Sequence, residues 1–428
     1  MISLLLTILF LVFIAAGVPI SMSMGLATVI SLIFGGYSGF LFIMPQQMVE
    51  GVDHAALLAI PFFILAGNLM NASGMTDKIF DFASAVIGHI RGGLAQVNVL
   101  ASMVFAGVSG AAVADCAGLG IVEIKAMSER GYKRAFAAAI TAASSAVGPI
   151  IPPSIPLVIY AYIAGTSVGR MFLGGMLPGI IIGLSLMATN YILSYKYDFP
   201  RVERAPLSKI ARSALDGVVA LIAPIIIIGS ILTGVVTATE SGVLASVYAL
   251  VVGLIYRGLT LRALWSALYE TMIMTTVIMF IIAFATAMGW LFAFEQIPQK
   301  LAGSMLALTS NKYVFLLLLI IVMLLIGCVL EGIPALLITL PLLLPLADKF
   351  GIDRVHFGLI VVYGLLIGIV TPPMGIALYI MVEVAQVSFE EVVAAVLPYL
   401  IPLIGVLLLI TYLPELTTFL PNLLMGAE

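Results

Sequence analysis

The sequence predicts an all-α polytopic membrane protein. Hydrophobic residues make up 63% of the 428 residues and charged residues only 9%, whereas soluble domains carry roughly 25% charge. A helix needs about 20 apolar residues to cross a bilayer, so the chain has room for roughly ten to twelve membrane segments. Two of its apolar stretches also echo each other, which indicates a duplicated unit.

Composition excludes several other classes. The net charge of −3 gives no reason to expect nucleic acid as a partner. The two cysteines, Cys116 and Cys328, lie in apolar surroundings, so a disulfide framework is not expected. No Gly-Lys dipeptide occurs, which excludes a P-loop. Energy must therefore come from an ion gradient or another subunit.

Apolar runs place the predicted helices, in chain order, near residues 2–20, 23–43, 55–72, 135–165, 171–194, 217–236, 240–256, 271–294, 355–386 and 392–413. The first lacks a basic region before it, so we expect a retained helix rather than a signal peptide. Two further runs, 94–127 and 313–349, are too long for one crossing and contain a glycine turn. They predict re-entrant hairpins. Residues 77–91 and 257–270 mix charged and apolar side chains, as helices in the membrane interface do.

The most polar break runs from Tyr195 to Arg212 and divides the chain into halves. Basic loops favour the cytoplasm, so we place this break there. The two hairpins then enter the membrane from opposite sides, and both termini lie outside. The predicted parts are N-terminal scaffold helices 1–54, a first inverted repeat 55–195, a cytoplasmic linker 196–216 and a second inverted repeat 217–428.

Each predicted repeat combines a glycine turn with a later Gly/Pro break. Gly107-Val108-Ser109-Gly110 precedes Gly148–Ser154, and Leu330-Glu331-Gly332 precedes Gly368–Met374. Gly110 and Pro152 lie 42 residues apart, and Gly332 and Pro372 lie 40 apart. Broken backbone is tolerated in lipid only where protein or a water-filled cavity satisfies it. The pattern is typical of a secondary transporter.

The breaks predict two Na⁺ sites built mainly from carbonyl oxygens. Each Pro-Pro pair lacks two N–H groups and so frees carbonyls from helical bonding, and such carbonyls commonly bind coupling ions. The predicted ligands are Ser109, Gly110, Gly148, Ile151 and Pro153 in the first site, and Gly327, Gly332, Gly368, Thr371 and Met374 in the second. The alternative is that these glycines and prolines only kink helices for packing.

Three other residues are candidates for the solute path. Carboxylates inside a membrane are expensive enough to count as functional candidates. Asp115 follows the first turn and Glu331 lies in the second, where each could cap its turn, line the path or relay protons. Ser154 follows the first Pro-Pro pair and could donate to an anionic solute or serve only the structure.

Several motifs together resemble the large membrane subunit of tripartite ATP-independent periplasmic (TRAP) transporters, the DctM type. They are Ile60–Gly67, Phe105–Gly110 with Asp115, Gly148–Ser154, Leu330–Ala335 and Thr371–Gly375. The resemblance covers essentially the whole chain. It implies a bacterial inner-membrane protein that works with a separate small four-helix membrane subunit and a periplasmic solute-binding protein. It also implies Na⁺-coupled import of an organic acid, of the sialic acid or C4-dicarboxylate class, by an elevator motion of a transport domain against a scaffold.

Two alternatives remain at this point. The Gly-Val-Ser-Gly sequence at residues 107–110 also resembles the nucleophile motif of rhomboid proteases, but such an enzyme needs a histidine base near the serine. None of the three histidines lies in an obvious partner helix. The nearer alternative is a stand-alone Na⁺-coupled carboxylate carrier of similar architecture, which would need no binding protein.

Overall fold

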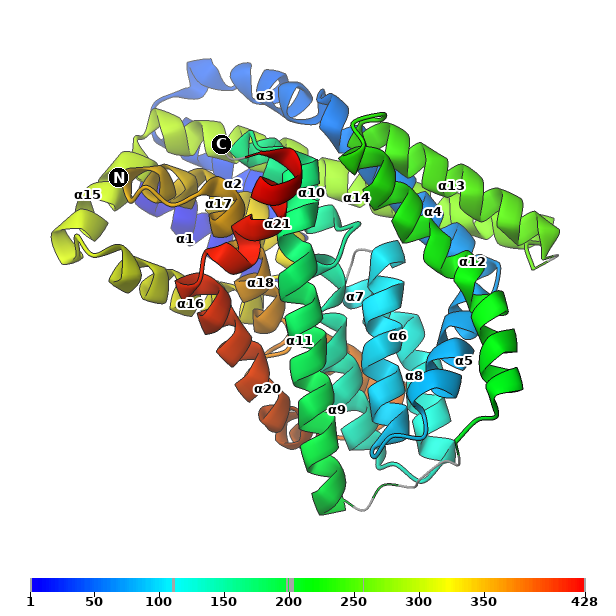
Figure 1. Cartoon of the computed structure of the whole chain (residues 1–428). Helices are drawn as coiled ribbons and strands as arrows, with labels where there is room; N and C mark the ends of the chain where they lie inside the picture. The colour runs from blue at the N-terminus through cyan, green and yellow to red at the C-terminus, as the bar shows by residue number, and fades with distance from the viewer. Residues whose placement is uncertain (1, 110–111, 198, 200–203, 257, 427–428) are drawn as a thin grey trace.

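The computed structural model describes residues 2–109, 112–197, 199, 204–256 and 258–426. All regular elements among them are helical (Figure 1). The α-helices are α1 (Ile2–Ala15), α2 (Ile20–Phe34), α3 (Ile43–Val52), α4 (Ala59–Ala72), α5 (Met75–Ile87), α6 (Gly93–Ser109), α7 (Ala112–Ala117), α8 (Leu119–Glu129), α9 (Arg134–Ser145), α10 (Ile155–Ala164), α11 (Val168–Tyr197), α12 (Leu207–Leu232), α13 (Ala238–Ile255), α14 (Leu261–Phe294), α15 (Ile297–Leu308), α16 (Lys312–Val329), α17 (Gly332–Lys349), α18 (Arg354–Gly368), α19 (Ile376–Ala385), α20 (Phe389–Tyr412) and α21 (Glu415–Met425).

In this described part of the chain, seven helices are long and apolar enough to cross a membrane, or nine if each bent pair counts as one span. The sequence predicted roughly ten to twelve segments from helix length alone. The difference comes from short apolar helices such as α1 and α2, of 14 and 15 residues.

Both predicted helix interruptions occur. The segment that contains α9 bends by 41° relative to α10, and residues 369–375 separate α18 from α19. The Pro152-Pro153 and Pro372-Pro373 bonds are both cis. Proline ends each helix because it removes an N–H donor and restricts the residue before it.

Within the predicted hairpin at 94–127, the described residues form α6, α7 and α8, and α7 and α8 are separated at Gly118. The predicted turn at Gly110 lies outside the described residues. The predicted hairpin at 313–349 consists of α16 and α17, joined through Leu330 and Glu331, and each of these two helices is long and apolar enough to cross a membrane by itself.

One predicted element is wrong. Of the predicted interface helix 257–270, the described residues 258–270 do not form a separate helix, because α14 is a continuous helix of 34 residues from Leu261 to Phe294. Thr260 starts it, since its side chain accepts a hydrogen bond of 3.1 Å from the backbone N–H of Ala263. Arg262 lies exposed in the first turn of this membrane-length helix, and Glu270 lies exposed further along the same helix. Likewise, α12 begins at Leu207, within the predicted linker.

The helices that lead into the two breaks lie at the centre of the molecule. Fourteen of the 15 residues of α18 are buried, as are ten of the 12 residues of α9. A helix that is buried on all sides must be small or apolar all round, as the alanine-rich α9 and the Leu/Ile/Val-rich α18 are. Both breaks therefore start from the protein interior.

The second part of each broken helix packs against the other half of the chain. α10 contacts α17 and α18, and α19 contacts α7, α8 and α9. The two halves are thus interleaved around the breaks.

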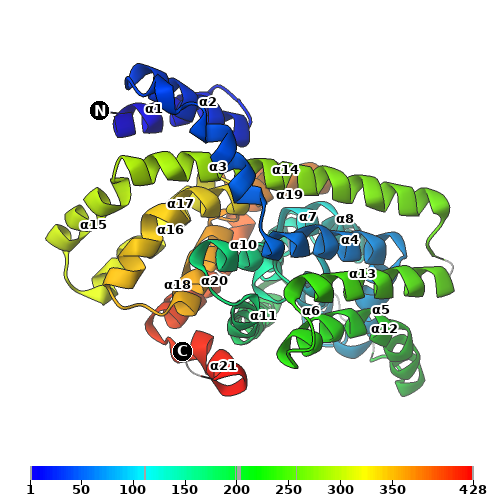
Figure 2. The same cartoon turned by 90° about the horizontal axis from the view of Figure 1, so that it is seen from above.

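A second group of helices includes α4, α12, α13 and α14. α13 lies against α4 and α12, and α14 lies against α2, α3 and α4. Figure 2 shows α14 running along the molecule. A small hydrophobic cluster in this group includes Leu69, Met70, Ala223, Ala249 and Val252. Other buried residues of the same helices belong to the main cluster.

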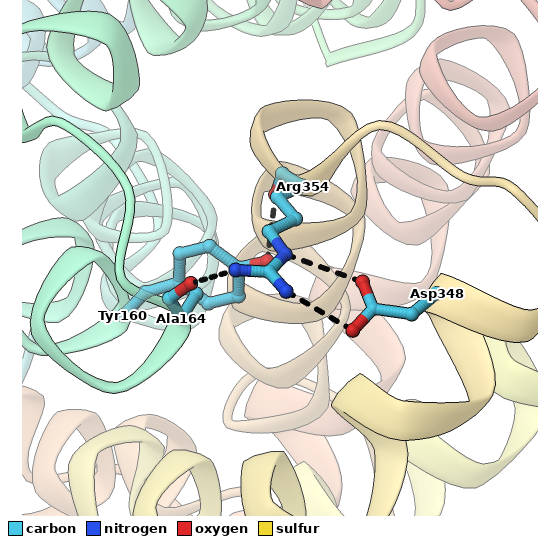
Figure 3. Close-up of polar contacts among 4 residues, drawn as sticks. All are labelled: Tyr160, Ala164, Asp348 and Arg354. Carbon is cyan, nitrogen blue, oxygen red and sulfur yellow. Dashed lines mark hydrogen bonds and ion pairs between the residues drawn. The ribbon is translucent and has the colours of Figure 1, made fainter.

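An arginine joins the end of α10 to the connection between α17 and α18 (Figure 3). The Arg354 guanidinium contacts both carboxylate oxygens of Asp348, at 3.2 and 3.1 Å, and donates to the Ala164 carbonyl at 2.8 Å. The Tyr160 hydroxyl donates to the Arg354 carbonyl at 2.6 Å. A cation beside the last carbonyls of a helix is also favoured by the helix dipole.

A buried hydrogen-bond network holds the first helix pair to α9. Asn98 on α6 donates to Glu123 on α8 at 2.5 Å and to Thr141 on α9 at 2.7 Å. Its carbonyl oxygen accepts from Ser144 at 2.8 Å, and Ser144 lies 3.0 Å from Ser102. All five side chains are at most 2% exposed. The Asn98 amide therefore joins three helices.

The second helix pair instead meets its broken helix through glycine backbone. A Cβ placed on Gly368 would lie 2.5 Å from the Gly327 backbone and 2.8 Å from the Cys328 nitrogen. Atoms this close cannot coexist without a backbone shift, so only glycine fits this contact between α16 and α18.

We expect Gly368→Ala to destabilise the protein by about 1–3 kcal/mol, the usual cost of overpacking. Its melting temperature in detergent should fall by several degrees. The matched control is Gly405→Ala in α20, where an added Cβ meets no atom within 4 Å. Equal melting temperatures for the two variants would contradict close packing at Gly368.

We expect Asn98→Ala to cost about 2–4 kcal/mol, since each buried polar partner left unsatisfied costs roughly 1–3 kcal/mol. Thermal unfolding measures this loss. Asn68→Ala is the control, because Asn68 is half-buried and donates to Thr271 at 3.0 Å. A loss no larger than that of the control would argue against the network.

Candidate functional site

The first break ends with Ser154, which starts α10. Its hydroxyl accepts from the Leu157 backbone N–H at 3.2 Å and donates to the Pro149 carbonyl, and its side chain is fully buried. A serine in this N-cap position satisfies one of the free amides of the helix start. The structure thus gives Ser154 a capping role within the break.

The other first-site residues lie along the same loop and on α6. The Ile151 N–H bonds to the Val147 and Gly148 carbonyls at 3.3 and 3.2 Å, and Pro153 is buried. Ser109 ends α6; its side chain, together with Gly110, lies outside the described residues. The structure therefore places Gly148, Ile151 and Pro153 together at the break and leaves the turn side of the site undefined.

The second break is bonded to the end of α16. The Gly375 N–H donates to the Cys328 carbonyl at 3.1 Å, and the Cys328 thiol donates to the Thr371 carbonyl at 3.1 Å. The Thr371 hydroxyl donates to the Ile367 carbonyl at 2.7 Å, and the Thr371 N–H to Gly368 at 2.9 Å. Carbonyls of Gly368 and Thr371 thus already accept hydrogen bonds, one from a weak thiol donor.

The two breaks differ in exposure. Pro152, Pro153 and Ser154 are buried, whereas Pro373 and Met374 are exposed; Met374 is 50% exposed. Gly332, at the start of α17, lines a small cavity of about 10 Å³ together with Pro156 of α10 and Leu366 of α18. The second turn and the first broken helix therefore meet at this point.

The two predicted acidic candidates occupy different positions. Asp115 is 2% exposed, on α7. Glu331 is half-buried at the N-cap position of α17, with its carboxylate near the backbone N–H of Ile333. An acid at a helix start is favoured by the helix dipole.

A third carboxylate, Glu123, was missed by the sequence analysis. It is fully buried in the network of Asn98 and Thr141, and within the described part of the chain its second oxygen has no hydrogen-bond partner. Its position inside the predicted hairpin was a sufficient reason to name it, because any carboxylate at membrane depth is a candidate.

The network has no counterpart in the second half. Shifted by the offset of the two turns, the positions of Asn98 and Glu123 become Ile320 and Pro345. Shifted by the offset of the two breaks, Thr141 becomes Val361. The polar cluster is thus particular to the first half.

No group of three or more His, Cys, Asp or Glu side chains that could hold a metal occurs in the described ranges. A Na⁺ site at the breaks would rely on backbone and hydroxyl oxygens, since hard cations prefer oxygen ligands.

Solved structures of transporters share this fold. The Alcanivorax borkumensis YdaH transporter matches with a TM-score of 0.63 at 16% identity, covering 90% of each chain. Neisseria gonorrhoeae MtrF matches with a TM-score of 0.65 at 15% identity, covering 89% of this chain and 85% of its own. At these identities the likeness concerns the fold alone.

Sequence relatives are much closer. The chain is 41% identical to the sialic acid TRAP transporter large permease protein SiaM of Vibrio cholerae, over 96% of each chain. It is 38% identical to the sialic acid TRAP transporter permease protein SiaT of Haemophilus influenzae, over 98% of this chain and 68% of SiaT. It is 37% identical to the C4-dicarboxylate TRAP transporter large permease protein DctM of Pseudomonas aeruginosa, over 88% of each chain.

These relatives are transport proteins rather than enzymes, which removes the protease alternative. The family described as "Tripartite ATP-independent periplasmic transporter, DctM component" matches residues 7–416. The chain is therefore a multi-pass membrane protein that belongs to the DctM family, the large permease subunits of TRAP transporters.

Proposed function

We propose that this subunit imports an organic acid across the bacterial inner membrane by Na⁺ symport, together with a small four-helix membrane subunit and a periplasmic solute-binding protein. The observation that carries the proposal is near-full-length identity of 37–41% to permeases named for sialic acid and for C4-dicarboxylates. Both solutes are carboxylates. The identities are too similar to choose between them.

The proposed architecture consists of two inverted repeats, each with a re-entrant hairpin and a discontinuous helix. The matched spacing of turns and breaks supports it, as do the 41° bend at the first break and the interruption between α18 and α19. The reciprocal contacts of α10 with α17 and of α19 with α7 also fit two related units that share one site.

An elevator motion is the proposed mechanism. The helices around the breaks belong to the main hydrophobic cluster. Residues of α4, α12 and α13 also form a smaller cluster of their own, although each of these helices contributes to the main one as well. A group of helices with a cluster of its own can move as a near-rigid body, since packed interiors deform little. We assign the first group to the transport domain and the second to the scaffold.

The proposed Na⁺ sites use the ligands named above at each break. At the second, Na⁺ would take the place of weak donors such as the Cys328 thiol on the Thr371 carbonyl. The Thr371 hydroxyl donates its hydrogen to the Ile367 carbonyl, so the lone pairs of its oxygen can bind a cation. At the first break, the carbonyl oxygens of Gly148, Ile151 and Pro153 would bind Na⁺.

Electrostatics gives a reason for coupling. The proposed solute-path residues Asp115 and Glu331 are acidic, and an anionic solute beside them is repelled unless a cation lies close by. Bound Na⁺ would reduce that repulsion and so favour solute binding. Ser154 would contribute its hydroxyl if α10 shifts enough to release the Pro149 carbonyl.

Reconstitution tests the function. We expect liposomes that contain this chain, the small subunit and the binding protein to take up labelled sialic acid or succinate only with an inward Na⁺ gradient. Uptake that persists without the binding protein would instead support a stand-alone Na⁺-coupled carrier. Uptake driven equally well by K⁺ would contradict Na⁺ symport.

Thr371→Ala tests the second cation site. We expect the Na⁺ concentration for half-maximal uptake to rise roughly tenfold. The contact between a hydroxyl oxygen and Na⁺ is comparable to a hydrogen bond to a charged group, which contributes about 1.5–3 kcal/mol. Thr411→Ala is the matched control, since the buried Thr411 hydroxyl also donates one turn back, to Leu407 at 2.7 Å. An unchanged Na⁺ dependence in Thr371→Ala would remove this residue from the site.

A further inference from the structure

A basic pocket that shares no lining residue with either break lies between α5, the turn after α8 and the start of α12. Its volume is about 590 Å³. Its charged lining residues within the described chain are the basic Lys78, Arg130, Arg204, Lys209 and Arg212, and the acidic Asp81. The balance is strongly positive, so the pocket favours an anion.

An apolar surface adjoins the basic one on α12. Leu207, Leu215 and Val218 are 82%, 72% and 45% exposed. By helical periodicity Leu215 lies beside Arg212, and Leu207 and Val218 continue this apolar face away from Lys209. Four of the basic residues, Arg130, Arg204, Lys209 and Arg212, are exposed. Exposed cations beside exposed aliphatic side chains suit a ligand with a charged head and hydrocarbon chains.

We propose that this pocket binds the phosphate headgroup of an anionic phospholipid, with the acyl chains lying over Leu207, Leu215 and Val218. Guanidinium and ammonium groups form charge-assisted hydrogen bonds with phosphate oxygens, and basic clusters at the membrane surface attract anionic lipids. A soluble phosphate would use the same cations but would leave the apolar face of α12 without a role.

The position of the pocket gives the lipid a structural consequence. Arg130 follows α8, in the return arm of the first helix pair, whereas Lys209 and Arg212 lie on α12 of the second packing group. One headgroup in contact with both would hold these groups together at this end of the molecule. The inference needs only a membrane-embedded chain and does not depend on the transported solute.

Native mass spectrometry of the purified full-length chain tests the proposal, with phosphatidylglycerol and phosphatidylcholine as probes. We expect phosphatidylglycerol to bind more tightly. Lys209→Gln/Arg212→Gln should weaken its binding roughly thirtyfold, or about fivefold for each charge removed. The control, Lys125→Gln/Arg262→Gln, removes two exposed cations that do not line the pocket and should leave binding within about twofold of wild type.

Three outcomes would overturn the proposal. The first is equal weakening by the two double variants, which would indicate a general charge effect. The second concerns inorganic phosphate. If phosphate binds without displacing phosphatidylglycerol, and if Lys209→Gln/Arg212→Gln abolishes this phosphate binding, the pocket belongs to a soluble anion. The third is loss of a co-expressed small membrane subunit from that variant with lipid binding unchanged, which would assign it to a protein. Melting temperatures of the apo proteins confirm that each variant folds.

Discussion

The structure depends on one constraint: backbone polar groups removed from water must find partners inside the protein. Both chain breaks expose carbonyls and amides that helical bonding no longer satisfies, and both start from central, buried helices, α9 and α18. Capping by Ser154 answers this need at the first break. At the second, backbone and thiol contacts with the end of α16 do so.

The two halves meet the same need by different chemistry. In the first, an asparagine amide and a buried carboxylate join α6, α8 and α9. In the second, two glycines let α16 and α18 touch through their backbones. A hydrogen-bond network specifies one arrangement, since each partner is costly to leave unmade, whereas a glycine contact depends on shape alone. The second half, which contains this glycine contact, is also the half whose break exposes Pro373 and Met374.

The two breaks carry motifs that resemble the DctM family, and they are also where the two halves of the chain interleave. In the function proposed above, the carbonyl oxygens of the breaks bind a small cation, and that cation reduces the repulsion between an anionic solute and the acidic side chains of the solute path. A cation and an organic anion that share such a site have a physical reason to bind together. The basic pocket at α12 shares no lining residue with the breaks and has a different chemistry, because its cations are exposed and adjoin an apolar helix face.

Sequence alone determined the membrane class, the helical fold and the two interruptions, because long apolar runs, glycine and proline act locally on the backbone. It did not determine that α14 is continuous, since charges near a helix start resemble an interface helix until the cap at Thr260 is seen. Nor did it single out Glu123, whose partners Asn98 and Thr141 come from separate helices. Only tertiary packing brings such residues together, so the polar network and the basic pocket became visible only in the folded chain.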